Sequence, residues 1–181
     1  VAAAWAELYD PGASRLDRAL SVVLVISIVA AVATTVYVIV VPKEGEHFTE
    51  FYILGPGGKA ADYPTDFPAG SIQTVIIGVG NHEYRNITYT IETLLLNQTF
   101  DTRTNTSTIH AVEPLERFSL TVPHNETREV IWNFTVASTD YNRLEFLLFN
   151  ETVPDDSVTG SDRINASYRD LHLWIRVRPP A

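Results

Sequence analysis

The sequence predicts a mainly β protein, in which one N-terminal transmembrane α-helix is followed by an antiparallel β-sandwich of seven or eight strands. Three observations predict this fold class. Residues 19–41 form a long apolar run without a charged residue, later segments alternate apolar with polar residues, and turns rich in Gly and Pro separate those segments. We therefore expect a short N-terminal lead at 1–18, a transmembrane helix at 19–41 and an extracytoplasmic, glycosylated β-sandwich domain at 42–181.

The apolar run from Ala19 to Val41 is long enough to cross a bilayer as one helix. At about 1.5 Å per residue it rises about 35 Å, more than a hydrocarbon core of about 30 Å. The run also exceeds the apolar part of a signal peptide, about 7 to 15 residues, so we expect an anchor that stays in the lipid bilayer. Ser27, Ala31 and Thr35 recur every four residues, which predicts a stripe of small side chains where a second helix packs closely.

Eight short segments beyond this helix carry the alternation of apolar and polar residues that is typical of strands. Each segment has one apolar face, and two sheets can bury such faces against each other. We therefore expect a charge at Ile76, Trp132 or Ile175 to unfold the domain. The run Gly55–Gly58 is expected to form a tight turn. The expected strands are residues 48–54, 71–79, 87–96, a weak edge at 108–112, 117–122, 129–137, 143–149 and 170–178.

Composition excludes several classes of function. The formal net charge is −9 at pH 7, which argues against nucleic acid as a partner because phosphates demand a surplus of Lys and Arg. The chain has no cysteine, so it has neither disulfides nor a thiol nucleophile. Its five histidines show no metal-binding spacing,. We expect no enzyme activity, no cofactor and no metal site, and the acidic loop at 155–162 is expected to be a solvated turn rather than a calcium site.

Asparagine gives the strongest signal about location. Nine asparagines occur, all after residue 41, and only Asn81 and Asn142 do not begin an Asn-x-Ser/Thr triplet. Such triplets are acceptors for N-linked glycans outside the cytoplasm. We therefore expect a single-pass protein of the cell membrane, with a cytoplasmic N-terminus and an extracellular C-terminal domain. The expected glycosylation sites are Asn86, Asn97, Asn105, Asn125, Asn133, Asn150 and Asn165.

The last expected strand, 170–178, carries the candidate interface. Leu171, Leu173, Ile175 and Val177 would face the core, so His172, Trp174 and Arg176 would face away from it,. Exposed Trp and Arg are typical anchors of protein interfaces. The alternative is that loops of the domain itself cover this face.

The run Glu50–Ala60 (EFYILGPGGKA), the NHEY run at 81–84 and the closing Leu173-Trp174-Ile175 resemble an archaeal membrane-protein family of unknown function. Its members carry several predicted spans and then an extracytoplasmic β domain, whereas this sequence shows one span. The order of strands, Gly and Asn at 68–94 is also similar to immunoglobulin-like modules of surface and adhesion proteins. The resemblance implies an immunoglobulin-like sandwich and supplies no catalytic residue.

Two classes of function fit these observations. The first is a non-enzymatic, membrane-anchored, N-glycosylated archaeal cell-surface protein that acts in envelope or filament assembly or adhesion through self-association. The alternative is an accessory extracellular module that binds a carbohydrate or a membrane partner within a larger complex, an inference from fold analogy. A hydrolase that uses a metal among the histidines would be a third class.

Overall fold

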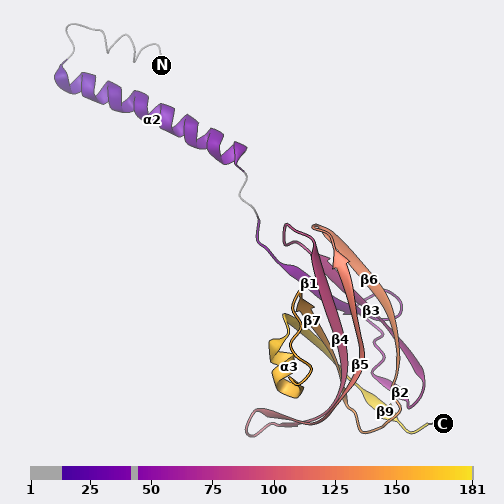
Figure 1. The fold of residues 1–181 in the computed structure, drawn as a ribbon. Coiled ribbons are helices and arrows are strands. Elements are labelled where there is room, and N and C mark those ends of the chain that lie inside the picture. Colours follow the sequence, from indigo (N-terminus) through magenta and orange to yellow (C-terminus); the bar gives the residue numbers. More distant parts are fainter. Residues whose placement is uncertain (1–13, 42–44, 181) are drawn as a thin grey trace. The chain divides into compact units, whose positions relative to one another are not determined.

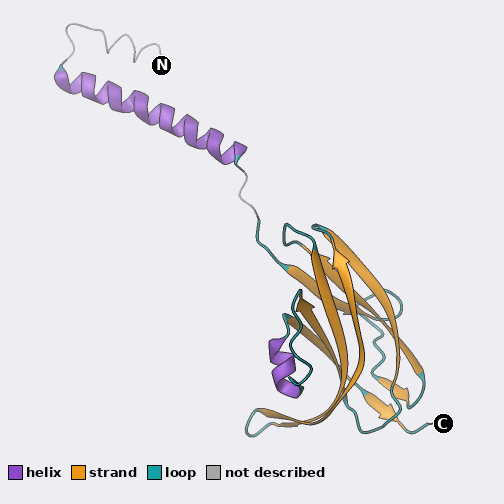
Figure 2. Cartoon of the chain, viewed as in Figure 1, coloured by secondary structure: helices purple, strands orange, loops and turns teal. Residues whose placement is uncertain are grey.

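The computed structural model describes residues 14–41 and 45–180 and divides the chain into two compact units, Val1–Gly45 and Glu46–Ala181 (Figure 1). The first unit contains helix α2 (Arg15–Val40). The second, the β domain, contains nine strands and helix α3 (Gly160–Ala166) among the described residues (Figure 2). Residues 1–13 of the expected lead and residues 42–44 lie outside the described residues.

The nine strands confirm a mainly β fold with antiparallel sheets. One sheet has the order β1-β3-β6 and a second has the order β5-β4-β7-β8, both antiparallel throughout. A short parallel pair, β2-β9, is separate from both. The strands are β1 (Thr49–Leu54), β2 (Asp66–Pro68), β3 (Ile72–Asn81), β4 (Ile87–Asp101), β5 (Thr106–Val122), β6 (Glu126–Thr135), β7 (Arg143–Asn150), β8 (Arg169–Trp174) and β9 (Arg176–Arg178).

Helix α2 begins at Arg15 rather than at Ala19 because a capping box precedes it. The Ser14 hydroxyl accepts a hydrogen bond from the Asp17 backbone N–H at 3.1 Å. The Asp17 carboxylate in turn accepts from the Ser14 backbone N–H at 3.2 Å, so two N–H groups at the helix start are satisfied. The helix is long and apolar enough to cross a membrane, compatible with a single-pass anchor.

The expected packing stripe lies on the exposed surface of α2. Ser27, Ala31 and Thr35 are all exposed. The hydroxyls of Ser27 and Thr35 donate to the carbonyls of Val23 and Ala31 at 2.8 and 2.9 Å. Because these donors are satisfied inside the helix, the stripe presents small side chains without an unpaired hydroxyl proton, as a hydrocarbon environment requires.

The core lies between the inner faces of the two larger sheets. The Trp132 ring of β6 stacks on Phe134 at 4.8 Å and meets Phe146 of β7 edge-on at 5.7 Å between ring centroids. Its indole N–H donates to the Glu116 carboxylate at 2.6 Å, so this polar group is satisfied where it is buried,. Tyr89 is fully buried, and its hydroxyl is 2.7 Å from the Thr49 hydroxyl of β1. Other buried core residues are Val75, Ile77, Val79, Ile87, Ile91, Leu95, Leu144 and Leu148.

The structure corrects the predicted elements at four places. The expected segments at 108–112 and 117–122 are one strand, β5, which continues through Pro114 on the edge of its sheet, beside a β-bulge,. The last expected strand is divided at Ile175, whose N–H donates to the Asn142 carbonyl at 2.9 Å. Beyond it β9 pairs with β2, which lies between the expected strands 48–54 and 71–79. Helix α3 was not expected.

Two glycines of β3 allow β1 side chains to cross the sheet. A Cβ at Gly78 would lie 2.2 Å from the Tyr52 ring, so only Gly leaves room for this ring. The Tyr52 hydroxyl reaches over β3 and donates to the Glu129 carboxylate of β6 at 2.7 Å. Burial, reinforced by this carboxylate, raises the pKa of Tyr52 to about 12,.

The positions expected to be sensitive to charge differ in burial. Trp132 and Ile175 are 4% and 6% exposed, whereas Ile76 is half-buried on the outer face of its sheet. Burying an unpaired carboxylate is costly, so Trp132→Asp is expected to prevent folding. Ile76→Asp is expected to cost only about 1 kcal/mol. Thermal unfolding of the detergent-solubilised chain measures both, and a Trp132→Asp variant that melts like the parent would contradict this assignment of the core.

Candidate functional site

The outer face of the β5-β4-β7-β8 sheet is covered by α3 and by the loop before it (Figure 1). A second apolar cluster forms there, so β4 and β7 are buried on both faces. Its buried members are Leu94, Leu96, Leu147 and Phe149, and its partly buried members are Ile109, Val112, Val153 and Ile164.

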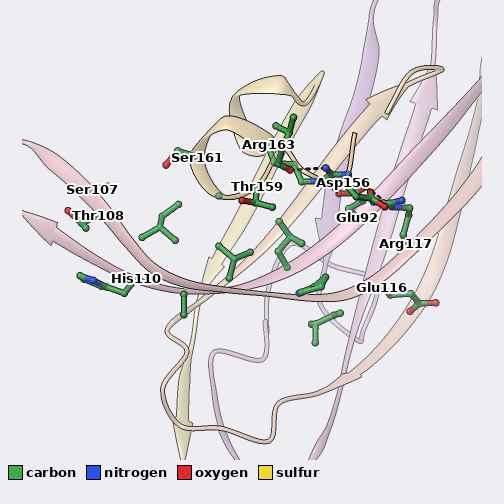
Figure 3. Close-up of a pocket in the computed structure, with 18 residues that line it drawn as sticks. Glu92, Ser107, Thr108, His110, Glu116, Arg117, Asp156, Thr159, Ser161 and Arg163 are labelled. Atoms are coloured by element: carbon green, nitrogen blue, oxygen red, sulfur yellow. Dashed lines mark hydrogen bonds and ion pairs between the residues drawn. The ribbon is translucent and has the colours of Figure 1, made fainter. Parts of the chain in front are cut away.

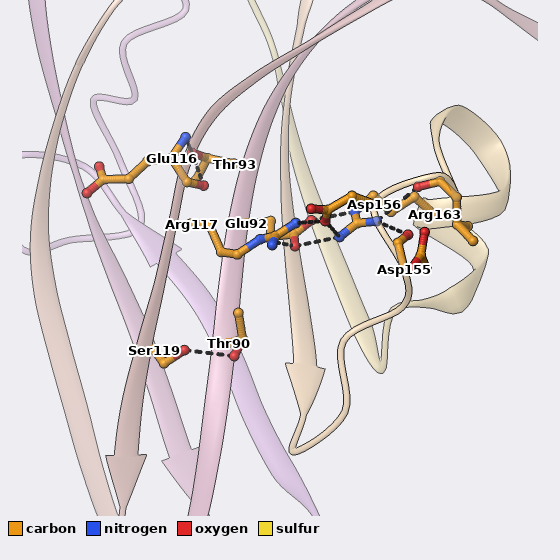
Figure 4. Close-up of polar contacts among 10 residues, drawn as sticks. Thr90, Glu92, Thr93, Glu116, Arg117, Ser119, Asp155, Asp156 and Arg163 are labelled. Carbon is orange, nitrogen blue, oxygen red and sulfur yellow. Dashed lines mark hydrogen bonds and ion pairs between the residues drawn. The ribbon is translucent and has the colours of Figure 1, made fainter.

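A buried ion pair attaches α3 to this sheet. Arg163 of α3 donates to both carboxylate oxygens of Glu92 on β4, at 2.6 and 2.7 Å (Figure 4). The two residues are 5% and 3% exposed. Arg163 also donates to the backbone carbonyls of Asp155 and Val158 at 3.0 and 2.9 Å. One guanidinium therefore fixes the helix, the loop before it and the sheet with charge-assisted hydrogen bonds.

Two further charged residues, Arg117 and Asp156, connect the ion pair to the surface of the domain. Arg117 of β5 lies 2.7 Å from Glu92 and 2.6 Å from Asp156 (Figure 4). Hydrogen bonding to Asp156 raises the pKa of Arg117, which keeps the guanidinium charged. The loop expected as a solvated acidic turn thus uses Asp156 as an ion-pair partner.

A groove opens between α3 and the long β4–β5 hairpin (Figure 3). We call it the outer groove, with a volume of about 1130 Å³. Apolar side chains line its floor and charged groups lie at one end, where Arg117, Asp156 and Arg163 meet (Figure 3). Pockets of this size that combine apolar walls with a few polar groups are typical of ligand sites. Its apolar lining includes Leu94, Ile109, Ala111, Val112, Pro114, Leu115 and Val158.

The candidate interface on the last strands is brought together only in part. His172 and Trp174 lie on the outer face of β8, with ring centroids 5.9 Å apart, and the Arg143 guanidinium lies 5.6 Å from the Trp174 ring. Trp174 is 49% exposed. Arg176 lies on β9, beyond the break at Ile175, beside Asp66 of β2. We call the exposed surface of His172 and Trp174 the β8 face.

Beside the β8 face lies a buried carboxylate that sequence reasoning missed. Glu145 of β7 is 0% exposed. Its Oε2 accepts from Arg143 Nε at 2.5 Å, while its Oε1 has no hydrogen-bond partner among the described residues. Burial raises the pKa of Glu145 to about 7, although Arg143 opposes this shift,. Ligand atoms of Glu145, Asp170 and His172 lie within 4.8 Å of one another.

The five histidines do not form a common site in the described part of the chain. His47 and His124 both contact the Tyr84 ring, His82 stacks on Phe48, and His110 lies 2.8 Å from the Thr99 hydroxyl. His172 instead lies close to the carboxylates of Glu145 and Asp170. The signal in the sequence was the Asp-x-His spacing at 170–172, which places both side chains on one face of a strand.

The nine asparagines fall into two groups. Asn81 is buried and donates to the carbonyls of Arg85 and Val122 at 2.7 Å. Asn142 accepts from the Gln98 N–H at 3.0 Å and donates to the Gln98 carbonyl at 2.7 Å. These two hold the fold together and carry no acceptor triplet. Of the seven in triplets, Asn86, Asn105, Asn125, Asn133 and Asn165 are exposed, and Asn97 and Asn150 are partly buried.

Removing one member of the buried ion pair should destabilise the β domain. Arg163→Met leaves the Glu92 carboxylate buried with Arg117 alone and is expected to cost about 3 kcal/mol in free energy of unfolding. The double variant Glu92→Leu/Arg163→Met is expected to recover most of this loss, because no buried charge remains. Chemical denaturation of the full chain measures both. As a control, Arg85→Met removes an exposed ion pair with Glu151 and should change the free energy of unfolding little. Equal losses in Arg163→Met and in the double variant would contradict the prediction.

Solved structures similar to this chain are distant from it. The CARDB domain of the PF1109 protein of Pyrococcus furiosus, solved with di-metal ions, is 12% identical over 72% of this chain and 93% of that chain, with a TM-score of 0.42. A β-glucosidase of Listeria innocua, solved with glucose, is 9% identical over 75% of this chain but only 17% of the enzyme, with a TM-score of 0.43. A chain of the human zinc 2-glycoprotein and prolactin inducible protein complex is 8% identical over 75% of this chain and 99% of that chain, with a TM-score of 0.40.

Among curated proteins none matches the sequence. A family model does match it, over residues 42–176, and its description is a domain of unknown function, DUF1616. This range is more than half of the chain and includes strands β1 to β8, helix α3 and the first residue of β9. The chain therefore belongs to the DUF1616 family.

Proposed function

We propose that the protein is a non-enzymatic, N-glycosylated surface protein, anchored by α2 with its β domain outside the cell. It acts by associating with further copies of itself in an envelope or filament assembly. The resemblance to archaeal membrane proteins supports an archaeal cell surface. The observation that carries the proposal is the division of the asparagines into a structural pair without acceptor triplets and a surface set with them.

This division of the asparagines matches what N-glycosylation requires of its acceptor sites. A glycan can be attached only to an asparagine whose side chain reaches solvent, and none of the seven triplet asparagines is buried. Several lie in tight turns, where Asn105 and Asn125 adopt positive φ angles of 54° and 60°. Asn tolerates this backbone region better than most residues, so local structure explains the asparagine at these turns but not the Ser or Thr two positions later.

Glycan positions also favour one surface for association. On the outer face of the β1-β3-β6 sheet, Ile131 is 69% exposed and Asn133 follows two residues later on the same side of β6. A glycan on Asn133 would cover that apolar surface. The β8 face has no acceptor asparagine on its own strand, and an exposed Trp is a typical interface anchor. We therefore assign self-association to the β8 face.

The outer groove supports a second candidate, the accessory binding module. Its apolar floor and charged end suit an elongated ligand such as a carbohydrate chain or a segment of a membrane partner,. In this case binding depends on the groove rather than on Trp174.

Glycosylation is expected to follow exposure. In protein isolated from a host with N-glycosylation, Asn86, Asn105, Asn125, Asn133 and Asn165 should carry glycans at higher occupancy than Asn97 and Asn150. Asn150 should be lowest, because its Oδ1 is buried without a hydrogen-bond partner among the described residues. Glycopeptide mass spectrometry measures occupancy site by site. Bare asparagines throughout would overturn both the topology and the proposal.

Self-association is expected to depend on Trp174. Trp174→Ala should weaken it about thirtyfold or more, since interface Trp anchors contribute at least about 2 kcal/mol. Crosslinking and native electrophoresis of the protein in mild detergent measure the assembled fraction. Ile131→Ala is the matched control and should leave assembly unchanged. If Ala111→Arg, which obstructs the outer groove, lowers partner capture while Trp174→Ala does not, the accessory module replaces self-association.

A further inference from the structure

Glu145, Asp170 and His172 form a cluster of potential metal ligands at the edge of the β5-β4-β7-β8 sheet. Glu145 and His172 are direct partners in the β7–β8 register, and Asp170 lies two residues before His172 on the same face of β8. One ligand atom from each residue lies within 4.8 Å of the other two. Antiparallel pairing thus brings two carboxylates and an imidazole to one point.

The buried carboxylate indicates that something is bound there. Glu145 is 0% exposed, and its Oε1 accepts no hydrogen bond from any described residue. A buried polar atom without a partner is costly, and native structures contain few of them. A cation beside Oε1 would satisfy this oxygen. Arg143 donates to the other oxygen, Oε2, and so orients the carboxylate.

We propose that Glu145, Asp170 and His172 bind a divalent transition-metal ion, and we assign it as Zn²⁺. One imidazole nitrogen with two carboxylate oxygens is a donor set that zinc accepts, whereas Ca²⁺ and Mg²⁺ prefer oxygen ligands alone. The two carboxylates supply negative charge at the site, and the Arg143 guanidinium beside Glu145 offsets part of it. This inference does not rest on the proposed function, although His172 belongs both to the cluster and to the β8 face.

The geometry needs only a small adjustment to close around the ion. Ligand atoms of a tetrahedral zinc site lie about 3.4 Å apart, given bonds of about 2.1 Å. Asp170 and His172 are exposed, so their side chains can rotate toward the buried oxygen of Glu145. Three protein ligands leave the fourth position to water or to a group from outside the chain. The bound ion would also fasten the edge strand β8 to β7.

The test is zinc binding by the full chain in detergent, purified without a polyhistidine tag and first treated with a chelator. Isothermal titration with ZnCl₂ is expected to give one ion per chain. Asp170→Asn and His172→Ala each remove a ligand, and each should weaken binding more than about 100-fold, beyond the loss typical of residues that only orient a ligand. His124→Ala changes an exposed histidine outside the cluster and should bind zinc like the parent chain.

A second readout uses Trp174, whose ring centroid lies 5.9 Å from that of His172. Co²⁺ bound at the cluster is expected to quench Trp174 fluorescence in a saturable way, and Trp174→Phe should lose this response while still binding zinc. Failure to bind zinc, or equal affinity in the parent chain and in His172→Ala, would overturn the proposal. Circular dichroism of each variant separates loss of a ligand from loss of the fold.

Discussion

The ion pair between Glu92 and Arg163 is the interaction on which the outer face of the β domain depends. Withdrawing two charges from water is expensive, and it is tolerated only where geometry and further hydrogen bonds compensate. Here both carboxylate oxygens are engaged, and the same guanidinium also binds two backbone carbonyls. Since α3 has only seven residues, it is too short to persist on its own. The pair therefore holds in place the cover over β4 and β7 and one wall of the outer groove.

The sequence predicted the elements whose signal is local. The expected strand at 143–149 closely matches β7, in which Leu144, Phe146 and Leu148 face the core while Leu147 and Phe149 face the outer cluster. The uncharged run at 19–41 likewise predicted α2 apart from its first turn, where the polar cap lies outside the apolar run. The turn at Gly55–Gly58 was also predicted from its residues, and the Gly58 N–H donates to the Gly55 carbonyl at 3.0 Å.

The remaining features depend on residues that are far apart in the chain. Helix α3 has no apolar repeat, and its main contact joins positions 71 residues apart. For the candidate site, the alternation of apolar and polar residues correctly predicted that His172 and Trp174 face away from the core. Adding Glu145 to them needs the register between β7 and β8, which no single-sequence pattern contains. The alternation of residues placed Arg176 on one strand with Trp174. The break at Ile175 that separates them depends on a hydrogen bond to Asn142, a residue far away in the chain.

Strand β1 has a mechanical consequence, because it is the first element of the β domain to follow the segment that leads from α2. With the anchoring and self-association proposed above, tension in the chain would reach the β domain at the start of β1, where Thr49 lies. That residue is hydrogen-bonded to Tyr89 of the opposite sheet, and Tyr52 is fastened across β3 to Glu129. A pull on the tether would thus be shared between both layers of the sandwich rather than peeling off a single edge strand.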